Sequence, residues 1–123
     1  MYIHFILYFL RTIKDGLHGT ISEIKIQYIT IPGTAVLSCQ YEKNPTLRWF
    51  RRRFIISQDT SINPAVNGSE RFRATNKLQD KQYELQILNT TEEDVGLYVC
   101  QAQIISISIE TKVMLKLAGN TII

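Results

Sequence analysis

The chain has 123 residues, of which 45% are hydrophobic and 20% are charged, and these proportions are ordinary for a globular protein. Its length fits one domain with a single core. The net charge of +3 excludes the uniform basicity of a nucleic-acid-binding arm, because the basic side chains are grouped locally. The charge comes largely from Arg48, Arg51, Arg52 and Arg53, with Arg71 and Arg73 further on.

The first ten residues are almost entirely apolar, with His4 as the polar interruption. A run this short cannot span a bilayer as a helix, but it has the length of the apolar region of a signal peptide. No Lys or Arg precedes the run and no Ala-x-Ala site follows it, so a misassigned start or a fragment is the alternative. We expect a signal peptide or disordered leader over residues 1–19, cut after Gly19. No second long apolar stretch follows, which predicts no membrane span within the chain.

Short runs of alternating apolar and polar residues predict β-strands along the rest of the chain, separated by turn signals. The expected strands cover residues 24–31, 34–41, 47–51, 54–56, 71–75, 83–88, 96–102 and 109–117. Residues 57–70 are expected to form a loop or irregular edge, and residues 91–94 a short helical turn capped by Thr90 or Thr91. Residues 103–108 are expected to form a short loop, with a continued strand as the alternative because Ile and Ser alternate there.

A widely spaced set of residues carries a resemblance to a known family. Cys39 and Trp49 are followed by Leu85-x-Ile87 and then by the run Glu93-Asp94-Val95-Gly96-Leu97-Tyr98-Val99-Cys100. With these motifs, residues 33–117 resemble an immunoglobulin-superfamily domain of the variable or intermediate type. The resemblance implies an all-β fold, an immunoglobulin-like β-sandwich of two antiparallel sheets with Greek-key topology. The domain would cover residues 20–118, and residues 119–123 would form a tail or linker.

The same resemblance implies structural roles for the motif residues. Cys39 and Cys100 would form a disulfide between the sheets, covered by Trp49, and Leu85 would lie in the core. The Tyr98 hydroxyl would bond to backbone near the preceding turn, and Arg71 would pair with Asp94, with Arg73 as the alternative partner. A bridge closing this loop stabilises by about 4 kcal/mol and persists in an oxidising compartment; two free thiols in a cytosolic domain are the alternative.

The spacing between motifs distinguishes the chain from antigen receptors. The loops after Cys39 and after Gln103 are short, and no Gly-x-Gly bulge follows the second one. The segments Glu70-Arg71-Phe72, Tyr83-Glu84-Leu85-Gln86-Ile87 and Tyr98-Val99-Cys100-Gln101 are similar to the N-terminal domain of the nephrin, Kirre and Roughest group of cell-adhesion receptors. This similarity implies cell recognition by a domain belonging to a longer receptor.

Two glycosylation sequons support an extracellular, secreted or cell-surface location. They begin at Asn67 and Asn89, whereas Pro45 disqualifies the triplet at Asn44. Together with the expected leader and disulfide, they predict a glycoprotein exposed to an oxidising environment.

One face of the expected sandwich has the composition of a protein interface. The residues that alternate with Trp49 and Cys100 point outward, and Ile55 lies on the neighbouring strand. Aromatic and arginine side chains are enriched in interfaces, and the family resemblance implies that this face pairs with another immunoglobulin domain, homophilically or heterophilically. The predicted partner-binding residues are Arg48, Phe50, Arg52, Ile55, Val99, Gln101 and Gln103.

Other functions have weaker support. The Arg48–Arg53 cluster predicts, as the alternative, weak binding of anionic glycans. Nucleic-acid binding through base stacking is disfavoured because the family resemblance implies that Trp49 lies in the core. We expect no enzyme, no metal and no cofactor, since the only histidines are His4 and His18 in the leader, and both cysteines are used in the disulfide.

Overall fold

The computed structural model describes residues 23–119, which form nine β-strands and two 3-10 turns. The strands are β1 (Ile24–Ile29), β2 (Thr34–Gln40), β3 (Thr46–Arg51), β4 (Phe54–Gln58), β5 (Ser61–Ile62), β6 (Phe72–Lys77), β7 (Gln82–Leu88), β8 (Gly96–Ile104) and β9 (Ile107–Leu117). The 3-10 turns are η2 (Ser69–Arg71) and η3 (Glu92–Asp94). Within this described part, no helix has the length and apolarity to cross a membrane. The leader predicted over residues 1–19 lies outside the described residues.

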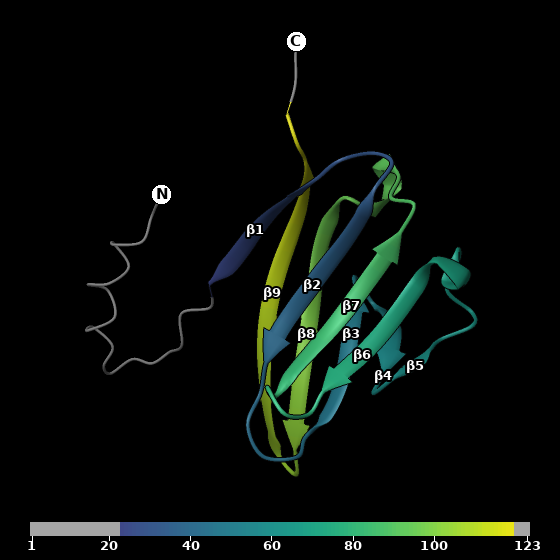
Figure 1. The fold of residues 1–123 in the computed structure, drawn as a ribbon. Helices are drawn as coiled ribbons and strands as arrows, with labels where there is room; N and C mark the ends of the chain where they lie inside the picture. Colours follow the sequence, from purple (N-terminus) through teal and green to yellow (C-terminus); the bar gives the residue numbers. More distant parts are fainter. Residues whose placement is uncertain (1–22, 120–123) are drawn as a thin grey trace, which may run out of the picture.

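The strands form a sandwich of two sheets, seen one behind the other in Figure 1. The larger sheet has the order β1-β9-β8-β3-β4-β5, and the smaller sheet has the order β2-β7-β6. This arrangement confirms the predicted fold class, with one correction. The first strand pairs in parallel with β9, so the larger sheet is mixed rather than purely antiparallel.

The core lies between the sheets and is built around the expected Cys39–Cys100 disulfide, which joins β2 to β8. Trp49 is fully buried beside it and stacks on Tyr83, with ring centroids 6.0 Å apart. Leu85, Ile87, Val113 and Leu115 are likewise 0–1% exposed, as strand alternation requires of every second residue. Residues from both sheets therefore form one apolar core.

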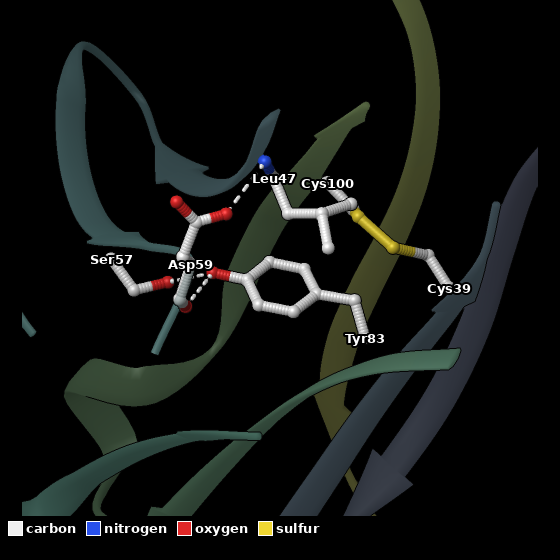
Figure 2. The surroundings of a disulfide bond; sticks show 6 residues. All are labelled: Cys39, Leu47, Ser57, Asp59, Tyr83 and Cys100. Carbon is white, nitrogen blue, oxygen red and sulfur yellow. Dashed lines mark hydrogen bonds between the residues drawn. A yellow bond between two sulfur atoms is a disulfide. The ribbon is translucent and has the colours of Figure 1, made fainter. Parts of the chain in front are cut away.

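Tyr83 adds a polar contact inside this layer. Its hydroxyl donates to the carbonyl oxygen of Asp59 and accepts from the Ser57 hydroxyl, 2.8 Å away. The Asp59 carboxylate accepts from the backbone N–H of Leu47 at 3.3 Å (Figure 2). Burial raises the pKa of Tyr83 to about 12, and the hydrogen bonds of its hydroxyl join the end of β4 and the following turn to the core.

The base of the sandwich, where η3 leads into β8, is closed by an ion pair between Arg71 and Asp94. The guanidinium donates to both carboxylate oxygens, at 2.9 and 3.0 Å, and also to the carbonyl oxygens of Leu88 and Asn89. Burial alone would raise the pKa of Asp94, but the bonds from Arg71 and the Thr91 N–H lower it below its ordinary value. At the base, the positive charge of Arg71 and the negative charge of Asp94 therefore neutralise each other.

Tyr98 and Thr91 fix the same corner. The Tyr98 hydroxyl donates to the carbonyl oxygen of Asp94 at 2.7 Å, inside the protein, as expected. Thr91, rather than Thr90, caps η3, because its side chain accepts from the Glu93 N–H while Asp94 accepts from the Thr91 N–H. The hydroxyl of Thr90 instead donates to the Thr30 carbonyl oxygen.

The loop expected over residues 103–108 is mostly strand. Strand β8 continues to Ile104, β9 begins at Ile107, and the two residues pair directly across a turn of Ile105 and Ser106. The alternating Ile and Ser residues therefore extend the hairpin, as the alternative interpretation predicted. Ile105 at the tip is 92% exposed.

Candidate functional site

The predicted partner-binding residues, except Arg52, lie together on the outer face of the larger sheet. Arg48 lies between the buried Leu47 and Trp49, and Gln101 lies between the buried Cys100 and Ala102. Because successive side chains on a strand point to opposite faces, both point away from the core. We call the surface formed by the outward residues of β4, β3, β8, β9 and β1 the outer face.

An apolar row crosses the outer face. Phe50 on β3 is directly opposite Ile55 on β4 and Val99 on β8. A β-bulge between Trp49 and Phe50 shifts the register, so that Ile56 and Ser57 are both buried and Ile55 remains outside. Such bulges re-aim a side chain, and this one brings an isoleucine beside the phenylalanine. The three side chains form a continuous, partly exposed apolar strip.

Arg48 lies next to this strip and is held by three glutamines. Its Nε donates to Gln58 at 3.1 Å, and its Nη1 donates to Gln101 and Gln103, both at 3.3 Å. All three acceptors are neutral amide oxygens, and within residues 23–119 Arg48 forms no ion pair. Sequence reasoning missed Gln58, although it ends the strand next to that of Arg48. The arginine is thus fixed in position with its positive charge uncompensated.

Arg52 is displaced from the position expected for it. It lies in the turn between β3 and β4 with a left-handed backbone (φ 57) rather than on the strand face. There it borders a hollow of about 580 Å³ at the edge of the sandwich, together with Phe54 and Glu93. Strand β3 ends at Arg51, as predicted, and Arg52 leaves the strand face because the chain turns there to form the β3–β4 hairpin.

The basic cluster around residues 48–53 is divided by the fold. Arg51 points toward the base, where its Nη2 donates to the carbonyl oxygens of Glu93 and Val95 at 2.6 Å each. Its guanidinium also lies over the Tyr98 ring, 5.2 Å from the centroid. Arg48 is on the outer face, while Arg52 and Arg53 are exposed in the turn. A run that is continuous in sequence therefore does not form a single basic patch.

Strands β9 and β1 extend the outer face beyond the predicted residues. Glu110 pairs with Gln101, Lys112 pairs with Val99, and Ile24 pairs with Lys112. Ile24 is 49% exposed, Ile26 is 50% exposed and Tyr28 is 62% exposed. The alternation of β9 around the buried Val113 and Leu115 would have revealed the outward residues Glu110 and Lys112. The position of β1 had no such signal, since its pairing with β9 is a tertiary contact.

The two sequon asparagines are exposed and belong to none of these strands, although Asn67 borders the same hollow as Arg52 and Phe54. Asn67 is in the segment between β5 and η2, and Asn89 follows β7. A glycan on either side chain would start outside strands β3, β4, β8 and β9.

The described residues contain no group of three His, Cys, Asp or Glu side chains placed to bind a metal ion. Burial raises the pKa of Tyr98 to about 12, and its hydroxyl is used in the corner bond to Asp94. His4 and His18 lie outside the described residues.

The sequence matches the immunoglobulin V-set domain family over residues 32–116. Among solved structures, the second Ig domain of the mouse polymeric immunoglobulin receptor is similar, with a TM-score of 0.62 and 19% identity over 80% of this chain and 99% of that chain. Domains A168–A170 from titin give a TM-score of 0.62 and 18% identity over 78% of this chain and 30% of that chain. At these identities the likeness shows the fold alone. No curated protein matches the chain significantly, and the similarity to the nephrin, Kirre and Roughest group is not supported by these matches.

Proposed function

This chain belongs to the immunoglobulin V-set family, and from that premise we propose that it is an extracellular recognition module of a cell-adhesion or cell-surface receptor protein. It binds another immunoglobulin-type domain through the outer face. The disulfide, which persists in oxidising compartments, supports this location. The exposed sequons at Asn67 and Asn89 support glycosylation.

The observation that carries this proposal is the contrast between the outer faces of the two sheets. The smaller sheet presents mainly polar side chains, and an ion pair between Lys77 and Glu84 at 3.3 Å lies on it. The larger sheet presents the apolar strip of Phe50, Ile55 and Val99 with an uncompensated arginine next to it. Aromatic and arginine side chains together are the composition of interface cores. The outer face thus has an exposed apolar strip and an arginine that a protein partner would bury.

Recognition would work by complementarity between preformed surfaces. The bulge positions Ile55, and the glutamines position Arg48, so little side-chain freedom would be lost on binding. A single face of this kind binds weakly, and arrays on opposed cell surfaces would raise the avidity.

Phe50→Asp tests this function. The full chain, displayed as a multimer, would be applied to a panel of purified immunoglobulin-type ectodomains from the same genome, including the chain itself. We expect binding to at least one member, lost with Phe50→Asp and retained with Val36→Asp, which places the same charge at a 42% exposed residue of the smaller sheet. Equal binding by both variants, or no binding to any member, would reject the proposal.

Anionic glycan binding is the second candidate, supported by the adjacent exposed Arg52 and Arg53. A heparin column distinguishes the two functions, because contacts that depend on charge are screened by salt. Retention at low salt that is abolished by Arg52→Ala with Arg53→Ala would support glycan binding. Retention unaffected by these substitutions would exclude this turn as the glycan site.

A further inference from the structure

We propose that the partner is a second copy of this chain, bound face to face about a two-fold axis along β8, with Arg48 of each copy against the partner's Glu110. This inference rests on the proposed function of the outer face and identifies its occupant. It follows from the register of three neighbouring strands.

The register places opposite charges symmetrically about β8. Gln101 on β8 is directly opposite Arg48 on β3 and, on its other side, Glu110 on β9. All three point outward, as the alternation with buried neighbours shows. Adjacent strands are about 4.8 Å apart, so Arg48 and Glu110 lie at similar distances on the two sides of Gln101.

A two-fold axis that lies between two facing sheets and runs along β8 exchanges these two sides. Arg48 then meets the partner's Glu110, and Glu110 meets the partner's Arg48, as an isologous interface requires. Gln101 meets its own copy, and a side-chain amide can both donate and accept. One symmetry operation therefore forms two identical ion pairs.

The neighbouring row is complementary under the same operation. It runs Ile55, Phe50, Val99, Lys112 and Ile24 across β4, β3, β8, β9 and β1. Phe50 would meet the partner's Lys112, which is a favourable cation–aromatic contact. Ile55 would meet the partner's Ile24, and the two copies of Val99 would meet at the axis. Like charges are not brought together in either row among the described residues.

The isolated chain leaves these groups available. Arg48 donates only to neutral amides, through Nε and Nη1, and its Nη2 has no hydrogen bond within the described residues. Glu110 is exposed, and no ion pair joins it to another described residue. Twisted sheets cross at an angle of about 30° when they pack. Arg48 and Glu110 lie one strand spacing, about 5 Å, from the axis. There the crossing shifts Arg48 by only about 2–3 Å relative to the partner's Glu110, and the two long side chains can span this shift.

A charge-swap experiment tests the pairing. The full chain would be coupled to fluorescent beads, whose clustering amplifies weak contacts by multivalency. Wild-type beads should cluster, and Arg48→Glu or Glu110→Arg alone should reduce clustering about tenfold or more, because each places like charges together twice. Arg73→Glu, on the smaller sheet, should leave clustering unchanged.

Two recoveries distinguish this arrangement from a general effect of charge. Beads with Arg48→Glu should cluster with beads carrying Glu110→Arg but not with themselves. The chain carrying both substitutions should cluster with itself. Failure of wild-type beads to cluster, or absence of both recoveries, would overturn the homophilic pairing. The proposed function would survive that result if Phe50→Asp still abolished binding to a different ectodomain.

Discussion

Two arginines, one at the base of the sandwich and one on the outer face, are bound in opposite ways. Arg71 donates to both oxygens of a carboxylate that is 2% exposed. Arg48 is held by three neutral glutamine oxygens, at 3.1, 3.3 and 3.3 Å. The charge at the base is compensated within the chain, and the charge on the outer face is not. Holding an arginine in place and neutralising its charge are thus separate, and on the outer face the described residues do only the first.

The largest expected effect on stability comes from breaking the Arg71–Asp94 ion pair at the base. Arg71→Ala leaves Asp94 buried without its counter-charge, which should lower the free energy of unfolding by about 3 kcal/mol. Urea denaturation of the disulfide-bonded chain would measure it. Arg73→Ala is the matched control, because Arg73 is exposed and donates only to backbone carbonyl oxygens. Equal effects of the two substitutions would show that the base is not stabilised by its ion pair.

The Arg71–Asp94 ion pair should also make the free energy of unfolding depend on pH. The pKa of Asp94 is lowered in the folded state by Arg71 and the Thr91 N–H, despite the opposing effect of burial. Its contribution is therefore fully present above the unfolded pKa of about 4 and is lost as the pH falls through the lower folded value. Between pH 7 and pH 3 only part of the contribution is lost, so this change should be smaller than that of Arg71→Ala.

Urea midpoints at pH 7, 5 and 3 would measure this dependence. Asp94→Asn should be less stable at pH 7, and its midpoint should fall less than that of the wild type on acidification. A variant whose midpoint falls as steeply as the wild type would assign the acid sensitivity to other carboxylates.

The core and the base were more predictable from sequence than the outer face. Cys39, Trp49, Tyr98 and Cys100 form a motif whose geometry is fixed by core packing, and they occupy the positions that the motif implies. Tyr83 was missed, although it shares the two-residue period of Leu85. Its signal was present, but its hydrogen bonds to Ser57 and Asp59 depend on how β4 packs across the core.

The composition of the outer face depends on strand pairing, which local sequence specifies poorly. The bulge at Phe50 moves Ile55 into the apolar strip, and the tight β3–β4 turn removes Arg52 from it. Glu110 is far from Arg48 in sequence and becomes relevant only because β9 and β3 both flank β8. Residues 103–108 illustrate the same dependence, since the alternation of Ile and Ser fits either a loop or a hairpin.

The smallest expected effect on stability is the most informative about the outer face. Arg48→Ala removes a charge that has no counter-charge in the described part of the chain, so the free energy of unfolding should change by less than about 0.5 kcal/mol. Clustering of beads carrying the variant should nevertheless fall, because the partner's Glu110 loses its proposed ion pair. Urea denaturation and bead clustering, measured on the same preparation, separate the two effects. A loss of stability as large as that of Arg71→Ala would show instead that Arg48 and its glutamines hold the sheet together, and the contrast between the two arginines would then disappear.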